Sequence, residues 1–348
     1  MKANNRNDLL GELLRDVSRS FYLTLRVLPS AVREPISLAY LLARAADTIA
    51  DTEAIRTSQR LQLLKNFRQV LEQKYHHSLL LNDLKGLISQ QHNQQERLLL
   101  ERIGEAFWLL EQLHSSDRSQ VVSVVITLSE GMLFDLETFP PEDSSSVKAL
   151  PDESVLEHYT YLVAGCVGEF WSDICYGHDG RLAVWDLVEQ RALGRQFGKA
   201  LQLTNILRDI AEDLRIGRCY FPGNQLAELG ISVESLFDPD CVEALRPVQR
   251  EWMMRALEYY RSAGHYIMNT PRRCVKLRLA MLWPVLLGLR TLQLVASSED
   301  YLRPEKRIKV TRSEVYRLLL SSLPIACSNL AIKRWLARLQ TEVINELG

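Results

Sequence analysis

Two segments of the chain each carry a pair of aspartates four residues apart among apolar, helix-forming residues: Asp47 and Asp51 in the first, Asp209 and Asp213 in the second. On a helix, positions i and i+4 share a face, so each pair points in one direction. Two like charges at this spacing repel by roughly 0.2–0.5 kcal/mol on an isolated helix. A divalent cation would remove the repulsion, and Mg²⁺ is typically held by one or two carboxylates together with substrate phosphates. The pattern therefore predicts an enzyme that acts on diphosphates.

Further polar residues lie on or near these two faces: Tyr40, Arg44, Gln202, Asn205, Arg208 and Arg218. An ordinary amphipathic helix turns its polar face to solvent. Here the polar face is the minority face, so we expect it to line an internal cavity, where Arg208 and Arg218 can bind phosphate oxygens as planar forks. A single aspartate pair on a helix usually marks a solvated face. Two pairs in matching apolar settings, each with an arginine nearby, favour a metal site instead.

The composition is that of an ordinary soluble globular protein, with 47% hydrophobic and 24% charged residues. A net charge of −1 provides no basic field for nucleic acid. None of the six cysteines forms a C-x-x-C pair, which argues against zinc or a disulfide framework and predicts a reducing cytoplasm. The longest apolar run, Leu279 to Leu289, is shorter than the ~20 residues of a membrane helix, and the N-terminus has no signal-peptide core. We therefore expect no transmembrane segment.

Helical periodicity dominates the chain, and no linker or repeat interrupts it, so we predict a single all-α domain over residues 1–348. The predicted helices are Leu9–Ser18, Pro35–Asp51, Thr57–Tyr75, Gln95–His114, Arg118–Phe139, Glu153–Cys175, Leu182–Arg215, Val242–Met268, Cys274–Ser297 and Arg312–Glu346, the last with a break at Pro324.

The chain, from about residue 10 to 320, resembles the squalene/phytoene synthase family of head-to-head prenyl synthases. The resemblance implies an all-α isoprenoid-synthase fold with a central cavity. It also implies Mg²⁺-dependent condensation of two prenyl diphosphates through a cyclopropyl diphosphate intermediate. The matching stretches occur in the family's order: Val17 to Tyr22, Tyr40 to Asp51, Tyr159 to Gly168, and Gln202 to Asp213 followed by Gly217 to Pro222.

This resemblance also implies roles for individual residues. The first aspartate pair holds metal on one side of the cavity and the second pair on the other. Arg44 and Arg218 match family positions that contact phosphate. Ser18, Arg19 and Phe21 match the segment that closes over the diphosphate.

Tyr159 aligns with a family tyrosine implicated in proton handling or cation control during the first half-reaction. Gly165 and Gly168 follow it on the same predicted helix, where each glycine costs ~0.5–1 kcal/mol relative to alanine. These glycines allow the close approach either of a prenyl chain or of a facing helix.

The segment from Arg303 to Arg312 is strongly basic, since five of its ten residues are cationic. Such a run is usually a solvated loop. In squalene synthases the corresponding region lies near the NADPH site, so the resemblance makes Lys309 and Arg312 candidate contacts for the cofactor's phosphates. No G-x-G-x-x-G motif occurs, so NADPH would bind without a Rossmann unit.

The first functional hypothesis is a squalene synthase, which condenses two farnesyl diphosphates to presqualene diphosphate and reduces this with NADPH to squalene. The alternative is a family member that stops without reduction, such as a phytoene, dehydrosqualene or presqualene diphosphate synthase; the aspartates cannot separate the two. An inactive scaffold with the same fold is a third hypothesis, but no motif aspartate is lost. We expect a cytoplasmic enzyme in transient contact with the inner face of the membrane, because its product is apolar.

Overall fold

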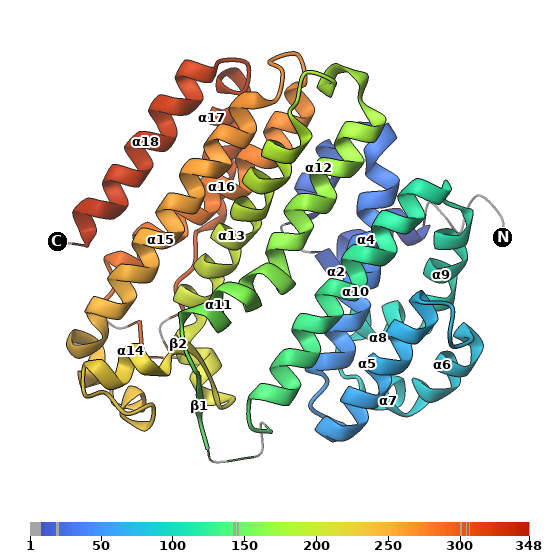
Figure 1. Cartoon of the computed structure of the whole chain (residues 1–348), viewed down its shortest axis with the longest axis horizontal. Coiled ribbons are helices and arrows are strands. Elements are labelled where there is room, and N and C mark those ends of the chain that lie inside the picture. Colours follow the sequence, from blue (N-terminus) through green and yellow to red (C-terminus); the bar gives the residue numbers. More distant parts are fainter. Residues whose placement is uncertain are drawn as a thin grey trace. The chain divides into compact units, whose positions relative to one another are not determined.

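The residues described by the computed structural model (Figure 1) are 8–18, 21–141, 144, 146–299, 301–303, 305 and 307–347. The chain divides into two compact units. Unit 1 comprises residues 1–137 and 170–180, and unit 2 comprises residues 138–169 and 181–348. Apart from two short strands, the regular structure of the described residues is helical, which confirms the predicted fold class.

Unit 1 is arranged around the long helix α4 (Ser30–Asp51). Its other elements are the π-helix η1 (Leu9–Leu13), α2 (Leu14–Ser18), α3 (Phe21–Val27), α5 (Thr57–Leu71), α6 (His77–Asp83), α7 (Lys85–Gln90), α8 (Gln94–Glu101), α9 (Ile103–Gln112) and α10 (Ser115–Thr138). Helix α4 packs against α5, α8 and α9. The buried Arg60 of α5 closes the C-terminal end of α4, because its Nη1 donates a hydrogen bond to the carbonyl oxygen of Ala50 over 2.9 Å. This hydrogen bond therefore fixes the C-terminal end of α4, which carries Asp47 and Asp51.

Unit 2 is arranged around the long helix α13 (Leu187–Arg215). Its other elements, with α12 shared between the units, are β1 (Lys148–Leu150), α11 (Glu153–Thr160), the π-helix η2 (Tyr161–Gly165), α12 (Cys166–His178), η3 (Gly180–Leu182), β2 (Arg218–Pro222), α14 (Gly223–Glu228), η4 (Glu234–Phe237), η5 (Pro239–Cys241), α15 (Val242–Asn269), α16 (Val275–Ala296), α17 (Arg312–Ile325) and α18 (Asn329–Glu346). Helix α13 packs against α15, α16 and η2.

A tight turn at Gly217 leads the chain from α13 into β2. The φ angle of Gly217 is 80°, in the left-handed region that glycine adopts without strain. Its carbonyl oxygen accepts a hydrogen bond from the backbone N–H of Lys148 over 3.0 Å. Strand β2 then pairs in parallel with β1. The sequence predicted no strand here, because segments of three and five residues are too short to show an alternating pattern.

The helix boundaries differ from the prediction in specific places. Helix α4 begins at Ser30, before the predicted start at Pro35. The predicted helix Gln95–His114 is two helices that meet at Arg102, and the predicted helix Glu153–Cys175 contains the π-turn η2. Helices α3, α6, α7 and α14 were not predicted, because six or seven residues carry too few turns for a periodic signal.

Helix α16 is apolar enough and long enough to cross a membrane. Within unit 2, however, 67% of its most apolar stretch is buried. Core packing against α13, α15, α17 and α18 accounts for this composition.

The glycines after Tyr159 lie where two helices cross at backbone contact. A Cβ atom on Gly168 would lie 1.8 Å from the carbonyl oxygen of Gly194, and one on Gly198 would lie 2.1 Å from that of Ala164. No side chain fits at such distances, so α12 and η2 touch α13 through their backbones. These glycines therefore allow the close approach of a facing helix.

We predict that Gly168→Ala and Gly198→Ala each lower the free energy of unfolding by about 2 kcal/mol or more, because the new methyl group collides with backbone atoms. Gly177→Ala is the matched control on α12, since nothing lies within 4 Å of the added Cβ. That change should alter stability by no more than about 1 kcal/mol. Denaturant unfolding measures all three, and equal stabilities would contradict the backbone contact.

Candidate active site

In unit 1, the candidate site residues form a polar stripe along α4. Tyr40, Arg44 and Asp47 are partly exposed and Asp51 is exposed, while the intervening leucine, alanine and isoleucine side chains are buried. The predicted sharing of one face is therefore confirmed for this helix. Because the opposite face is packed into unit 1, both carboxylates stay on the accessible face of α4.

Arg44 is held between two carboxylates. It is hydrogen-bonded to Asp47 through Nη1, and its Nη2 donates a bond to Glu96 Oε1 of α8 over 2.6 Å. Burial opposes the charge on Arg44, but Asp47 and Glu96 outweigh it and raise the pKa of the guanidinium. Glu96 was not predicted as a site residue, because an ion pair between residues far apart in sequence leaves no local pattern.

The segment before α4 contributes an aromatic contact. The ring of Phe21 stacks on Tyr40, with 5.2 Å between centroids and 21° between planes. Ser18 is buried, and its hydroxyl donates to the carbonyl oxygen of Leu14, one turn earlier. Arg19, the third residue predicted here, lies outside the described residues.

In unit 2, the candidate site residues form a polar stripe along α13. Asn205 is exposed, and Gln202, Arg208, Asp209 and Asp213 are partly exposed. Arg208 forms a two-bond pair with Asp209, in which Nε donates to Oδ1 over 2.6 Å and Nη2 bonds Oδ2. The bond to Asp209 raises the pKa of Arg208. An arginine fork of this kind also matches the geometry of a diphosphate.

The basic segment after α16 lies beside this second stripe. Arg307 Nε is 2.6 Å from Oε1 of Glu212, the residue before Asp213. Arg218 begins β2 directly after the turn that ends α13. Lys309 and Arg312 are both exposed at the start of α17. The structure thus places the predicted cofactor segment close to α13, within unit 2.

Tyr159 belongs to a buried aromatic cluster. Its ring stacks on Tyr220 at a centroid distance of 4.9 Å, and its hydroxyl donates to the Tyr220 hydroxyl over 3.3 Å. Phe139 meets Tyr220 edge-on at 5.1 Å. The ring faces could stabilise a nearby cation. Tyr220 lies inside the stretch Gly217 to Pro222, which was recognised in the sequence, but its pairing with Tyr159 depends on tertiary packing.

The donor atoms available on each helix suit Mg²⁺. Carboxylate oxygens are the ligands that Mg²⁺ prefers, and this ion keeps several waters and takes phosphate oxygens from its substrate. Among the residues that the structure describes, no group of three or more His, Cys, Asp and Glu side chains is placed to hold a metal by itself. A two-carboxylate set on each helix, completed by water and diphosphate, is therefore the arrangement that fits.

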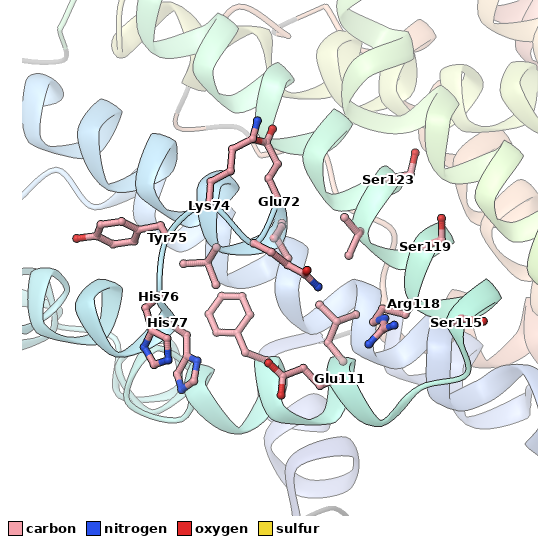
Figure 2. Close-up of a pocket in the computed structure, with 16 residues that line it drawn as sticks. Glu72, Lys74, Tyr75, His76, His77, Glu111, Ser115, Arg118, Ser119 and Ser123 are labelled. Atoms are coloured by element: carbon pink, nitrogen blue, oxygen red, sulfur yellow. The ribbon is translucent and has the colours of Figure 1, made fainter.

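A separate pocket of about 890 Å³ lies in unit 1, where the end of α5 faces α9 and α10 (Figure 2). Its rim mixes both charges, with Lys74 and Arg118 near Glu72 and Glu111. None of the predicted site residues lines it. We therefore exclude this pocket from the candidate site.

Comparison with known proteins agrees with this description. A squalene/phytoene synthase family profile matches residues 14–314. Presqualene diphosphate synthase of Zymomonas mobilis is 32% identical over 258 residues, which is 73% of each chain. The enzyme of the same name from Rhodopseudomonas palustris is 32% identical over 260 residues, 74% of this chain and 77% of that one. Squalene synthase of Schizosaccharomyces pombe is 24% identical over 314 residues, 90% of this chain and 64% of that one.

Solved structures share the fold. The complex of TcSQS with BPH1237 superposes with a TM-score of 0.76 at 20% identity, covering 98% of this chain and 92% of that chain. A dehydrosqualene synthase in complex with a ligand gives a TM-score of 0.63 at 19% identity, covering 96% and 98%. The predicted isoprenoid-synthase fold is confirmed.

Proposed function

Because the chain belongs to the squalene/phytoene synthase family, we propose that it joins two farnesyl diphosphates head to head to give presqualene diphosphate. The arrangement of α4 and α13 is the observation that carries this proposal. Each helix presents an aspartate pair and an arginine on one face, while apolar residues of its other faces are buried. Presqualene diphosphate synthases are among the relatives at 32% identity. These relatives support the non-reducing alternative better than the squalene synthase favoured by the sequence.

The side chains have complementary tasks in this reaction. Mg²⁺, held by Asp47 and Asp51 or by Asp209 and Asp213 together with diphosphate oxygens, would neutralise the departing pyrophosphate. Before substrate binds, the carboxylates of Asp47 and Asp209 are neutralised by Arg44 and Arg208. A metal held by these carboxylates would leave the guanidinium groups of Arg44 and Arg208 able to bind diphosphate oxygens.

The allylic cation that ionisation leaves behind needs an environment that excludes water. We assign this role to the buried faces of Tyr159 and Tyr220, since a desolvated ring face stabilises a cation by roughly 2 kcal/mol or more. Ser18, Phe21 and Tyr40 are proposed to lie against the substrate near α4. Gln202, Asn205 and Arg218 are proposed to do so near α13.

Reduction by NADPH to squalene is the second candidate function. The placement of the basic segment beside α13 supports it, because the cofactor's phosphates would need cations near the reacting diphosphate. Lys309 and Arg312 would be the contacts. The exposure of both side chains is equally compatible with a solvated loop.

We predict that purified protein given farnesyl diphosphate and Mg²⁺ forms presqualene diphosphate, and that added NADPH produces no squalene. Product extraction and mass spectrometry measure both compounds, and Asp209→Asn serves as the inactive control. Squalene formed only with NADPH would overturn the non-reducing assignment. In that case Lys309→Ala with Arg312→Ala should raise the KM for NADPH by about tenfold or more, since each lost contact is worth ~1.5–3 kcal/mol.

We further predict that Tyr159→Phe slows formation of the first intermediate by roughly 100-fold, as expected for a residue that handles a proton, and barely changes substrate affinity. Tyr220→Phe is the matched control, because it removes the other hydroxyl of the same pair and keeps the stacked ring. Its effect should stay within about tenfold, the value of one hydrogen bond. Single-turnover kinetics separate the two, and a normal rate for Tyr159→Phe would make Tyr159 a packing residue only.

A further inference from the structure

Helix α17 has one face fixed against the protein. Arg290 of α16 donates from Nε and Nη2 to Glu314 Oε1, over 3.1 and 2.7 Å. About two turns further along α17, the hydroxyl oxygen of Ser322 accepts a hydrogen bond from Trp283 Nε1 of α16 over 2.9 Å. Hydrogen bonds from Thr311 and Arg290 lower the pKa of Glu314 to about 2, so this anchor stays charged at neutral pH. The rotation of α17 about its axis is therefore defined.

The opposite face of α17 exposes large apolar side chains in a row. Tyr316 is 62% exposed, Leu320 66% and Leu323 47%, and Leu330 just beyond the helix is 57% exposed. Positions i, i+4 and i+7 lie on one side of a helix, so these residues form one stripe. A contiguous exposed apolar stripe on an ordered helix marks an interaction surface.

The exposed charges of the stretch that carries this stripe are cationic. Between residues 307 and 338 the sole acidic residue is Glu314, which is turned inward to Arg290 with 16% of its side chain exposed. The exposed charged side chains of this stretch are Arg307, Lys309, Arg312, Arg317, Lys333, Arg334 and Arg338, of which Arg307 and Arg338 pair with Glu212 and Glu342 outside it. Both α17 and α18 pack against α16 within unit 2 (Figure 1).

We propose that the outward face of α17 docks on the surface of an anionic lipid bilayer. A helix with an apolar stripe and a rim of arginine and lysine lies in the interface, with the stripe in the acyl boundary and the cations among the phosphates. We choose an anionic bilayer as the binding partner because residues 307–338 carry no exposed acidic side chain and therefore complement a negative surface. This docking surface goes beyond the proposed function and does not depend on it.

A second exposed apolar site in unit 2 provides a contrast. Val184 and Val188 are 73% and 79% exposed, more than any residue of the α17 stripe. Their exposed neighbours have both signs, with Asp186 and Glu189 beside Arg181 and Arg191. Apolar exposure is thus present at both places, but the charge around the valines is mixed, whereas the exposed charges of the α17 stretch are cationic.

Sedimentation with vesicles tests the proposal. The full chain should bind vesicles that contain phosphatidylglycerol and phosphatidylcholine, and should bind phosphatidylcholine vesicles at least tenfold more weakly. Leu320→Ser combined with Leu323→Ser should weaken binding by about tenfold or more, because two apolar anchors are lost. Arg317→Gln, Lys333→Gln and Arg334→Gln should each cost about fivefold, a value that falls as salt is added. Val184→Ser with Val188→Ser is the matched control and should bind normally.

A local readout accompanies sedimentation. Tyr316→Trp should place an indole in the interface, so brominated acyl chains should quench more fluorescence in this variant than in the parent protein. The proposal is overturned if the parent protein ignores anionic vesicles, or if the leucine double variant binds as well as the parent. It is also overturned if the stripe instead joins two copies of the chain, seen as a dimer that the double variant dissociates without any vesicle binding.

Discussion

Helices α4 and α13 each hold two like-charged carboxylates one helical turn apart. The helix itself fixes this spacing, so only a cation beside each pair can offset the repulsion. Arg44 and Arg208 neutralise one aspartate of each pair. The cap that Arg60 places on the end of α4 and the backbone contact between Gly168 and Gly194 keep these helices in place. We propose that a metal diphosphate completes this charge arrangement.

Sequence reasoning predicted what local periodicity encodes. The spacing of Asp47 and Asp51, and of Asp209 and Asp213, within long periodic helices was sufficient to place each pair on one face. The bond from Arg44 to Glu96 and the stacking of Tyr159 on Tyr220 join residues distant in sequence, so no local pattern contains them. Strands β1 and β2 and the shortest helices were missed because they contain too few periods for a recognisable pattern. A single domain over residues 1–348 stays a prediction, since each of the two units is held together by its own contacts.

The family and the reaction product are supported by different evidence. Membership rests on a match across residues 14–314 and on relatives at 32% identity. The two candidate products differ in whether a hydride is delivered after the condensation, and both readings share every motif aspartate, so the aspartates cannot separate them. If a cofactor is used, exposed cations such as Lys309 and Arg312 are the proposed contacts for its phosphates. The motifs that identify the family therefore carry little information about where the reaction stops.

The central claim is that the two aspartate pairs bind a metal diphosphate. Calorimetric titration with an unreactive farnesyl thiodiphosphate, with and without Mg²⁺, tests it most directly. The account predicts binding that requires Mg²⁺, and a loss of about tenfold or more in Asp47→Asn and in Asp209→Asn, as expected when a charged contact of ~1.5–3 kcal/mol is removed. Glu189→Gln, an acid on α13 outside the stripe, should bind normally. Tight binding without Mg²⁺, or unchanged binding in both aspartate variants, would contradict the claim.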